Sequence, residues 1–146
     1  MTLGDTTSVV ATGKLSQART HAIGTLVGNA EALLVAGGFS EAVSRPETGN
    51  GLVSMELFEI NRSDLPSSAP LCSGTALALG SPRGYASGTD IEEGFLVVGG
   101  IDEMGTVLNT AEILKVVDLE SCQVTAVPTT GALSQARAGS ALSTLI

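Results

Sequence analysis

The stretch TGKLSQAR at residues 12–19 returns as TGALSQAR at residues 130–137, with seven of the eight positions identical. A shorter form, Ser-Pro-Arg, lies between them at residues 81–83. Recurrence of a motif at intervals of tens of residues indicates an array of similar structural units. We therefore read the three arginines as markers of repeats. They define two units of unequal length and leave a short segment after the last arginine.

Each unit contains the same succession of strand-like segments. A small-residue segment follows the arginine, an apolar run ending in a glycine pair comes next, and a third segment carries a glutamate before large apolar residues. A weaker fourth segment carries one cysteine. Short β-rich runs bounded by turn residues predict strands, and four antiparallel strands per repeat are typical of a propeller blade. The expected strands are residues 20–27, 32–38, 53–60 and 71–77, then 84–89, 94–100, 109–117 and 122–127.

Both ends of the chain extend the pattern. Residues 7–11 precede the first motif as a fourth strand would, and residues 138–146 follow the last motif as a first strand would. We therefore expect an all-β fold of ten strands with almost no helix. Blade one is expected at about residues 19–77 and blade two at about residues 83–127, with the extra strands at either end.

This order of motifs resembles the kelch-repeat family, in its bacterial kelch-like form, over residues 7–146. The resemblance is carried by LLVAGG at residues 33–38, FLVVGG at 95–100, MELF at 55–58 and AEIL at 111–114. The tryptophan usual in the fourth strand is absent, and Phe58 and Leu114 stand where a tyrosine is usual. The resemblance implies kelch-type β-propeller blades. Because propellers close with about four to eight blades, we expect an incomplete ring that self-associates or joins further blades.

Charge and hydropathy disfavour two classes of partner. The chain of 146 residues has a formal net charge of −8, which repels nucleic acid phosphates and anionic lipid surfaces. No apolar run approaches the roughly 20 residues that span a bilayer, and the first residues lack the basic and apolar parts of a signal peptide. We expect a soluble protein that neither binds nucleic acid nor inserts into a membrane; its compartment is undetermined.

Candidate ligand-binding residues lie where the repeats place similar groups. The three recurring arginines stand where the innermost strand begins, a place at which the resemblance implies ligand contacts, although a guanidinium there can equally hydrogen-bond carbonyls of a neighbouring turn. Loops on a rigid scaffold commonly carry binding, so the loops after the glycine pairs, residues 39–52 and 101–108, form the second set. The candidates are Arg19, Arg83, Arg137, Phe39, Ser40, Ile101 and Asp102.

The glycine pairs are expected to be structural. They let the chain leave a crowded strand through positive φ or close packing. A phosphate-binding loop would require a following Lys-Ser or Lys-Thr and the start of a helix, and the sequence has neither. The four glycines are Gly37, Gly38, Gly99 and Gly100.

The residue types give little support to catalysis. His21 is the only histidine, so a histidine-rich metal site is ruled out. Ser87 lies one position too late for a GxSxG nucleophile motif, and the acidic turns lack the spacing of a calcium loop. We expect no catalytic residue, metal or cofactor, and hypothesise a non-catalytic scaffold for a protein or glycan partner. The alternative is a fragment or subunit of a larger kelch-like protein whose catalytic or ligand-binding part lies elsewhere.

The two cysteines, Cys72 and Cys122, are expected to remain unpaired. Equivalent fourth strands of neighbouring blades should lie toward a rim where the blades diverge, and a disulfide requires Cα atoms within about 7 Å.

Overall fold

The computed structural model describes residues 14–27, 32–40, 50–59, 72–119 and 121–142, and this part of the chain consists of strands and their connections, without helix. The predicted all-β class is confirmed. The strands are β1 (Ile23–Val27), β2 (Ala32–Ala36), β3 (Ser54–Glu59), β4 (Cys72–Ala78), β5 (Ser87–Ile91), β6 (Gly94–Val98), β7 (Ala111–Asp118) and β8 (Gln123–Pro128). Within the described ranges, no helix is long and apolar enough to span a membrane.

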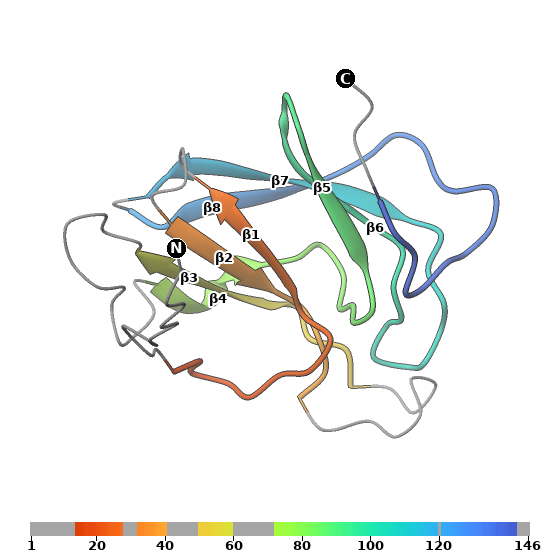
Figure 1. Ribbon diagram of the computed structural model, residues 1–146, viewed down its shortest axis with the longest axis horizontal. Coiled ribbons are helices and arrows are strands. Elements are labelled where there is room, and N and C mark those ends of the chain that lie inside the picture. The colour runs from red at the N-terminus through yellow and green to blue at the C-terminus, as the bar shows by residue number, and fades with distance from the viewer. Residues whose placement is uncertain (1–13, 28–31, 41–49, 60–71, 120, 143–146) are drawn as a thin grey trace, which may run out of the picture.

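The strands form two four-stranded antiparallel sheets, which we call sheet 1 (β1-β2-β3-β4) and sheet 2 (β5-β6-β7-β8). Neighbours in the chain are neighbours in each sheet, as Figure 1 shows. The repeat extends to register, because Leu34 pairs with Leu57 in sheet 1 and Leu96 pairs with Ile113 at the equivalent place in sheet 2. The repeated sequence therefore specifies a repeated three-dimensional unit.

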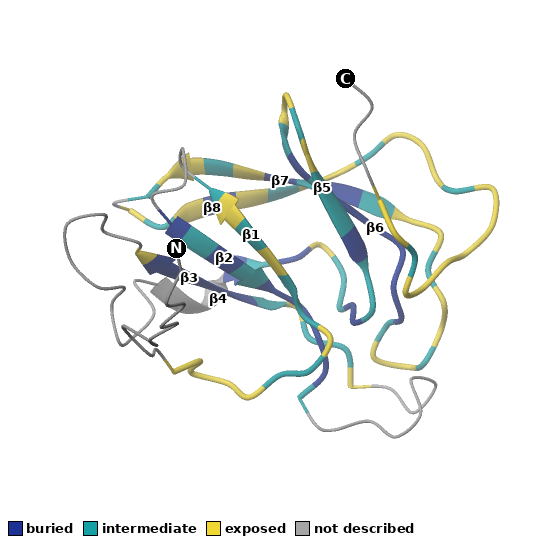
Figure 2. Ribbon diagram, in the orientation of Figure 1, coloured by how far each residue is buried: buried dark blue, intermediate teal, exposed yellow. Residues whose placement is uncertain are grey.

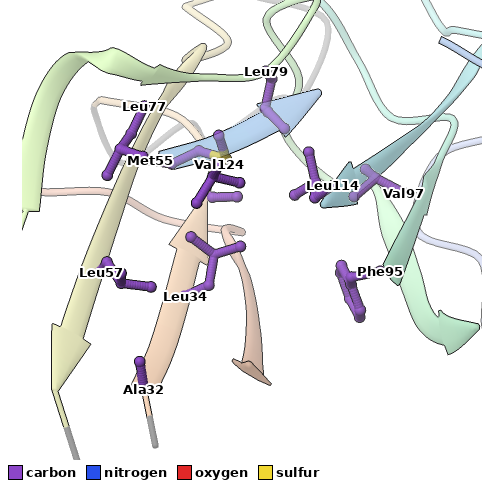
Figure 3. Packing of buried hydrophobic residues seen from close by; sticks show 11 residues of the cluster. Ala32, Leu34, Met55, Leu57, Leu77, Leu79, Phe95, Val97, Leu114 and Val124 are labelled. Atoms are coloured by element: carbon purple, nitrogen blue, oxygen red, sulfur yellow. The ribbon is translucent and has the colours of Figure 1, made fainter. Parts of the chain in front are cut away.

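The hydrophobic core lies between the two sheets (Figure 3). Alternate residues of β2 point into it, since Ala32, Leu34 and Ala36 are buried and their neighbours are half-buried (Figure 2). Burial of each large aliphatic side chain contributes about 1.5–3 kcal/mol to the free energy of folding. The buried members of the core are Ala32, Leu34, Ala36, Met55, Leu57, Leu77 and Leu79 on one side, and Phe95, Val97, Leu114 and Val124 on the other.

The two extra strands expected at the ends have different outcomes. Residues 7–11 lie outside the described residues. Residues 138–142, the described part of the expected last strand, contain no strand. A first strand of a sheet needs a second strand to pair with, and here the backbone N–H of Gly139 donates instead to the carbonyl of Tyr85 at 2.8 Å.

The expectation of two free thiols is wrong. Cys122 is disulfide-bonded, and Cys72 is the only other cysteine in the chain. The physical reason is the approach of the fourth strands, because β4 and β8 contact each other rather than diverging at a rim. Leu77 of β4 and Val124 of β8 belong to the same core.

Candidate functional site

Arg19 is held inside sheet 1 by a set of polar contacts. Its Nη1 donates to the carbonyls of Gly37 and Ser54, both at 2.9 Å, and its Nη2 donates to Glu56 Oε1 at 2.6 Å and to Ser54 Oγ at 3.2 Å. The other carboxylate oxygen of Glu56 accepts the backbone N–H of Ser16 at 2.7 Å. Charge-assisted hydrogen bonds of this kind fix both the guanidinium and the carboxylate.

Arg83 repeats this arrangement in sheet 2. Its Nη1 donates to the carbonyls of Gly99 at 2.8 Å and Thr110 at 3.3 Å, and its Nη2 donates to Thr110 Oγ1 at 3.3 Å. Its Nε forms an ion pair with Glu112 Oε1 at 2.9 Å. Glu112 Oε2 accepts the backbone N–H of Gly80 at 2.6 Å.

We call this arrangement a carboxylate clamp. It consists of an arginine, the backbone N–H three residues before it, and a glutamate near the start of a third strand. The glutamate lies two residues after a Ser or Thr. The side chains of Arg19 and Glu56 are each 1% exposed, and those of Arg83 and Glu112 are 1% and 3% exposed. These two arginines therefore bind carbonyls and a carboxylate of their own sheet and do not line an open cationic rim.

Burial and hydrogen bonding act in opposite directions on the clamp carboxylate of sheet 1. Burial raises the pKa of Glu56, but the hydrogen bonds from the Ser16 backbone and the Arg19 guanidinium lower it, and the net pKa is below the usual value. In sheet 2, burial lowers the pKa of Arg83 against the opposing effect of the Glu112 charge. The pairing keeps Glu56 ionised.

Arg137 has the same backbone position as Arg83 but not the same side-chain environment. The backbone N–H of Arg137 donates to the carbonyl of Leu108 at 3.0 Å, and its carbonyl accepts from the N–H of Gly100 at 2.8 Å. In the same way, the N–H of Arg83 donates to Leu52 at 3.2 Å and its carbonyl accepts from Gly38 at 2.9 Å. The Arg137 residue is exposed. No described residue forms a hydrogen bond or ion pair with its guanidinium. The structure thus separates the three sequence-predicted arginines into two clamped residues and one displayed residue.

The glycine pairs let the arginine segments pass close to the sheets. Gly37 and Gly38 have φ of 63° and 92°, and Gly99 and Gly100 have φ of 64° and 100°. A Cβ on Gly37 would collide with the carbonyl oxygen of Arg83, and one on Gly38 would lie 2.6 Å from the carbonyl oxygen of Thr20. Both the dihedral angle and the close approach require glycine.

The first residues of the two loops after the glycine pairs are packed inward. Phe39 is fully buried and Ile101 is 5% exposed, whereas Ser40 is half-buried. Residues 41–49 of the first loop lie outside the described residues. Phe39 and Ile101 therefore anchor their loops, and they do not display side chains to a partner.

Asp102 organises the second loop. Its Oδ1 accepts the backbone N–H groups of Met104 and Thr106, both at 2.8 Å. The hydrogen bond from Thr106 is the main reason that the pKa of Asp102 is lowered. Asp102 remains ionised and is half-buried, and Met104 at the tip of the turn is 82% exposed.

The two loops meet at one place on the surface. The backbone N–H of Asn50, at the end of the first loop, donates to the carbonyl of Glu103 in the second at 3.2 Å. A Cβ added to Gly51 would lie 3.0 Å from the carbonyl carbon of Asp102. The two loops are therefore far apart in the sequence but form one surface in the folded chain.

An aromatic group is joined to this surface by two backbone bridges, Phe39 with Gly51 and Gly84 with Ile101. The rings of His21 and Tyr85 stack with centroids 3.8 Å apart and planes at 29°, and the ring of Phe39 lies 5.6 Å from that of Tyr85. His21 and Tyr85 each follow a clamped arginine by two residues and each has φ of 53°. Positive φ at residues other than glycine is costly and concentrates at functional sites. We therefore regard this pair as part of the candidate site.

Sequence reasoning missed Tyr85 and the clamp glutamates. It considered His21 only as the single histidine, although Tyr85 stands at the same offset after Arg83. The glutamates Glu56 and Glu112 were recognised only as repeat markers. A repeated glutamate together with a repeated arginine, both in otherwise apolar surroundings, was the signal for a buried ion pair, because a lone buried charge is too costly to retain. Within the described part of the chain, no three His, Cys, Asp or Glu residues gather as metal ligands.

Comparison of the sequence with protein-family models and with curated proteins finds no match. The function is therefore inferred from the geometry of the two sheets and of the surface between them.

Proposed function

We propose that this chain is a non-catalytic binding scaffold built of kelch-type β-propeller blades, with sheets 1 and 2 as two blades. Its binding surface, which we call the loop surface, consists of His21, Asn50, Tyr85, Asp102 and Glu103. The observation that carries the proposal is that the backbone bridges at Phe39 and Gly84 bring the stacked aromatic pair next to the two hydrogen-bonded loops.

The loop surface suits recognition by preformed contacts. The described residues of its loops are held by backbone hydrogen bonds and by the buried anchors Phe39 and Ile101, so these residues lose little conformational entropy on binding. Aromatic rings with polar atoms offer large, rigid contact area to a partner. The surface carries the carboxylates of Asp102 and Glu103, so a complementary partner presents basic side chains or hydroxyl groups. A protein segment or a glycan meets these conditions.

The proposal is tested by screening the folded chain against a peptide-display library and a glycan array. Selected ligands are then measured with Tyr85→Gly and His21→Gly variants, because glycine adopts φ of 53° without strain. Gln123→Ala, at an exposed position in β8, is the control. We expect affinity to fall at least about tenfold in both glycine variants, as for central interface residues, and to be unchanged in the control. Ligands that bind all three variants equally would contradict the assignment of the surface.

A second candidate function is a part of a larger kelch-like protein whose catalytic or ligand-binding part lies elsewhere. It is favoured by the backbone hydrogen bonds of Arg137, which join this residue to sheet 2 as the equivalent bonds join Arg83 to sheet 1. This alternative predicts that neither screen yields a ligand for the loop surface, although the chain is folded.

A further inference from the structure

The three arginine motifs follow the same path, but only two of their clamps hold a glutamate. The backbone bends at residues 16–17, 80–81 and 134–135 alike. Leu79 and Leu133, each four residues before an arginine, donate their N–H groups to Val53 at 2.8 Å and Asn109 at 2.7 Å, which are equivalent positions of sheets 1 and 2. The third motif is therefore bound to sheet 2 by the same backbone hydrogen bond that binds the second motif to sheet 1.

The third clamp is exposed. Ser134 stands three residues before Arg137, where Ser16 and Gly80 donate to Glu56 and Glu112, and both Ser134 and Arg137 are exposed. We infer that Ser134 and Arg137 form a vacant carboxylate clamp that receives the third strand of a further blade, a strand beginning Ser-x-Glu or Thr-x-Glu. This inference rests on the interpretation of the two sheets as blades.

The sequence of the third motif specifies the strand that fits. Among the described residues of the first motif, Ser16, Gln17 and Arg19 contact the third strand of sheet 1. Gln17 donates its N–H to Glu56 Oε1 at 3.4 Å, and its side-chain oxygen accepts from Ser54 Oγ at 3.1 Å. The same residue types recur at positions 134, 135 and 137. The third motif therefore carries the groups that bind Ser54-Met55-Glu56 in sheet 1.

A row of apolar side chains on sheet 2 is equivalent in register to a row on sheet 1 that is buried against sheet 2. Leu34 and Leu57 pair across β2 and β3 and are 1% and 0% exposed, because they belong to the core shared with sheet 2. The equivalent pair in sheet 2, Leu96 and Ile113, is half-buried. Val127, the partner of Ile113 in β8, is 37% exposed.

These two features identify the occupant as a sheet. A small acid or a short peptide could bind the clamp, but it would leave the row of Leu96, Ile113 and Val127 uncovered. A further blade places its Ser-x-Glu or Thr-x-Glu strand in the clamp and its apolar face on the row, as sheet 2 does for sheet 1 through Glu112 and the core. The established interface between the sheets is thus the template for the next one.

The test uses an extended chain in which residues 1–137 are followed directly by residues 20–146. Because residues 130–137 match residues 12–19 at seven of eight positions, the junction reproduces the native lead into sheet 1. The added residues contain a second copy of both sheets, and the copy of sheet 1 supplies its Glu56 to the third clamp. Arg137→Gln and Ile113→Asp are introduced separately into the natural chain and into the first copy of the extended chain, with Gln123→Ala at the same copy as the control. Equilibrium unfolding is measured by urea denaturation.

We expect Arg137→Gln to lower the folding equilibrium constant of the added sheets on the order of a hundredfold, because loss of one partner leaves a buried charge unpaired. In the natural chain the same change should alter stability by no more than about twofold, as for an exposed residue. Ile113→Asp should likewise disrupt the extended chain far more than the natural chain. Added sheets that stay unfolded, or equal effects of each variant in the two chains, would overturn the inference. Neither result would affect ligand binding by the loop surface, which lies on the two existing sheets.

Discussion

The clamp of sheet 2 offers the clearest perturbation of the fold. Glu112→Gln keeps the size of the side chain but removes its charge, and the Arg83 guanidinium, with 1% of its side chain exposed, then loses the carboxylate at 2.9 Å from its Nε. The Gly80 N–H bonded to Glu112 Oε2 at 2.6 Å is also affected. Removing one member of a buried ion pair destabilises a protein by about 3–5 kcal/mol. Since glutamine retains shape and can still accept a hydrogen bond, we expect the lower end, about 3 kcal/mol.

The measurement is urea denaturation at neutral pH, followed by far-ultraviolet circular dichroism. The matched control is Glu92→Gln, which removes the same charge from the exposed turn between β5 and β6 and should change the free energy of unfolding by no more than about 0.5 kcal/mol. Equal, small effects of the two substitutions would refute the reasoning, because the buried pair would then not contribute to the stability of sheet 2.

Three further predictions concern other features. The folded pKa of Glu56 lies below its ordinary value of 4.5, so its contribution to stability is fully present above that value and is lost as the pH falls through the folded pKa. The free energy of unfolding of Glu56→Gln, measured at decreasing pH, should therefore fall less steeply than that of wild type. Reduction of the disulfide at Cys122 should lower the free energy of unfolding by about 4 kcal/mol, given the loop of about 50 residues that it closes, and identical urea midpoints with and without reductant would contradict this. Gly37→Ala should destabilise by about 1–3 kcal/mol because of its φ of 63° and the approach of Arg83, whereas Gly24→Ala in β1, where a Cβ meets nothing within 4 Å, should not; a calorimetric melting temperature for each variant decides between them.

The sequence predicted the repeating part of the fold well. The apolar runs that end in Gly38 and Gly100 are strands β2 and β6, and the glutamate-bearing segments are β3 and β7. These elements have strong local signals, because alternating or continuous apolar residues next to obligatory glycines restrict the backbone to few conformations. The order of strands in each sheet follows from their order in the chain.

The relation between the sheets could not be predicted from local signals. The approach of β4 to β8, and with it the disulfide at Cys122, depends on packing between residues far apart in sequence. The burial of Arg19 and Arg83 likewise depends on where Glu56 and Glu112 lie in three dimensions. The stacking of His21 on Tyr85 also joins positions 64 residues apart. The repeat motif indicated which residues are equivalent but did not specify what each of them contacts.

The central structural claim is that the repeated arginine is buried in an ion pair in each of the two sheets and exposed at its third occurrence. Hydrogen exchange of the arginine Nε–H groups, followed by ¹H–¹⁵N NMR with assignment by single Arg→Lys substitutions, tests it most directly. Burial protects such groups from exchange with water. We expect slow exchange for Arg19 and Arg83, whose side chains are each 1% exposed, and fast exchange for Arg137. Equal exchange rates at the three arginines, or faster exchange at Arg83 than at Arg137, would contradict the account.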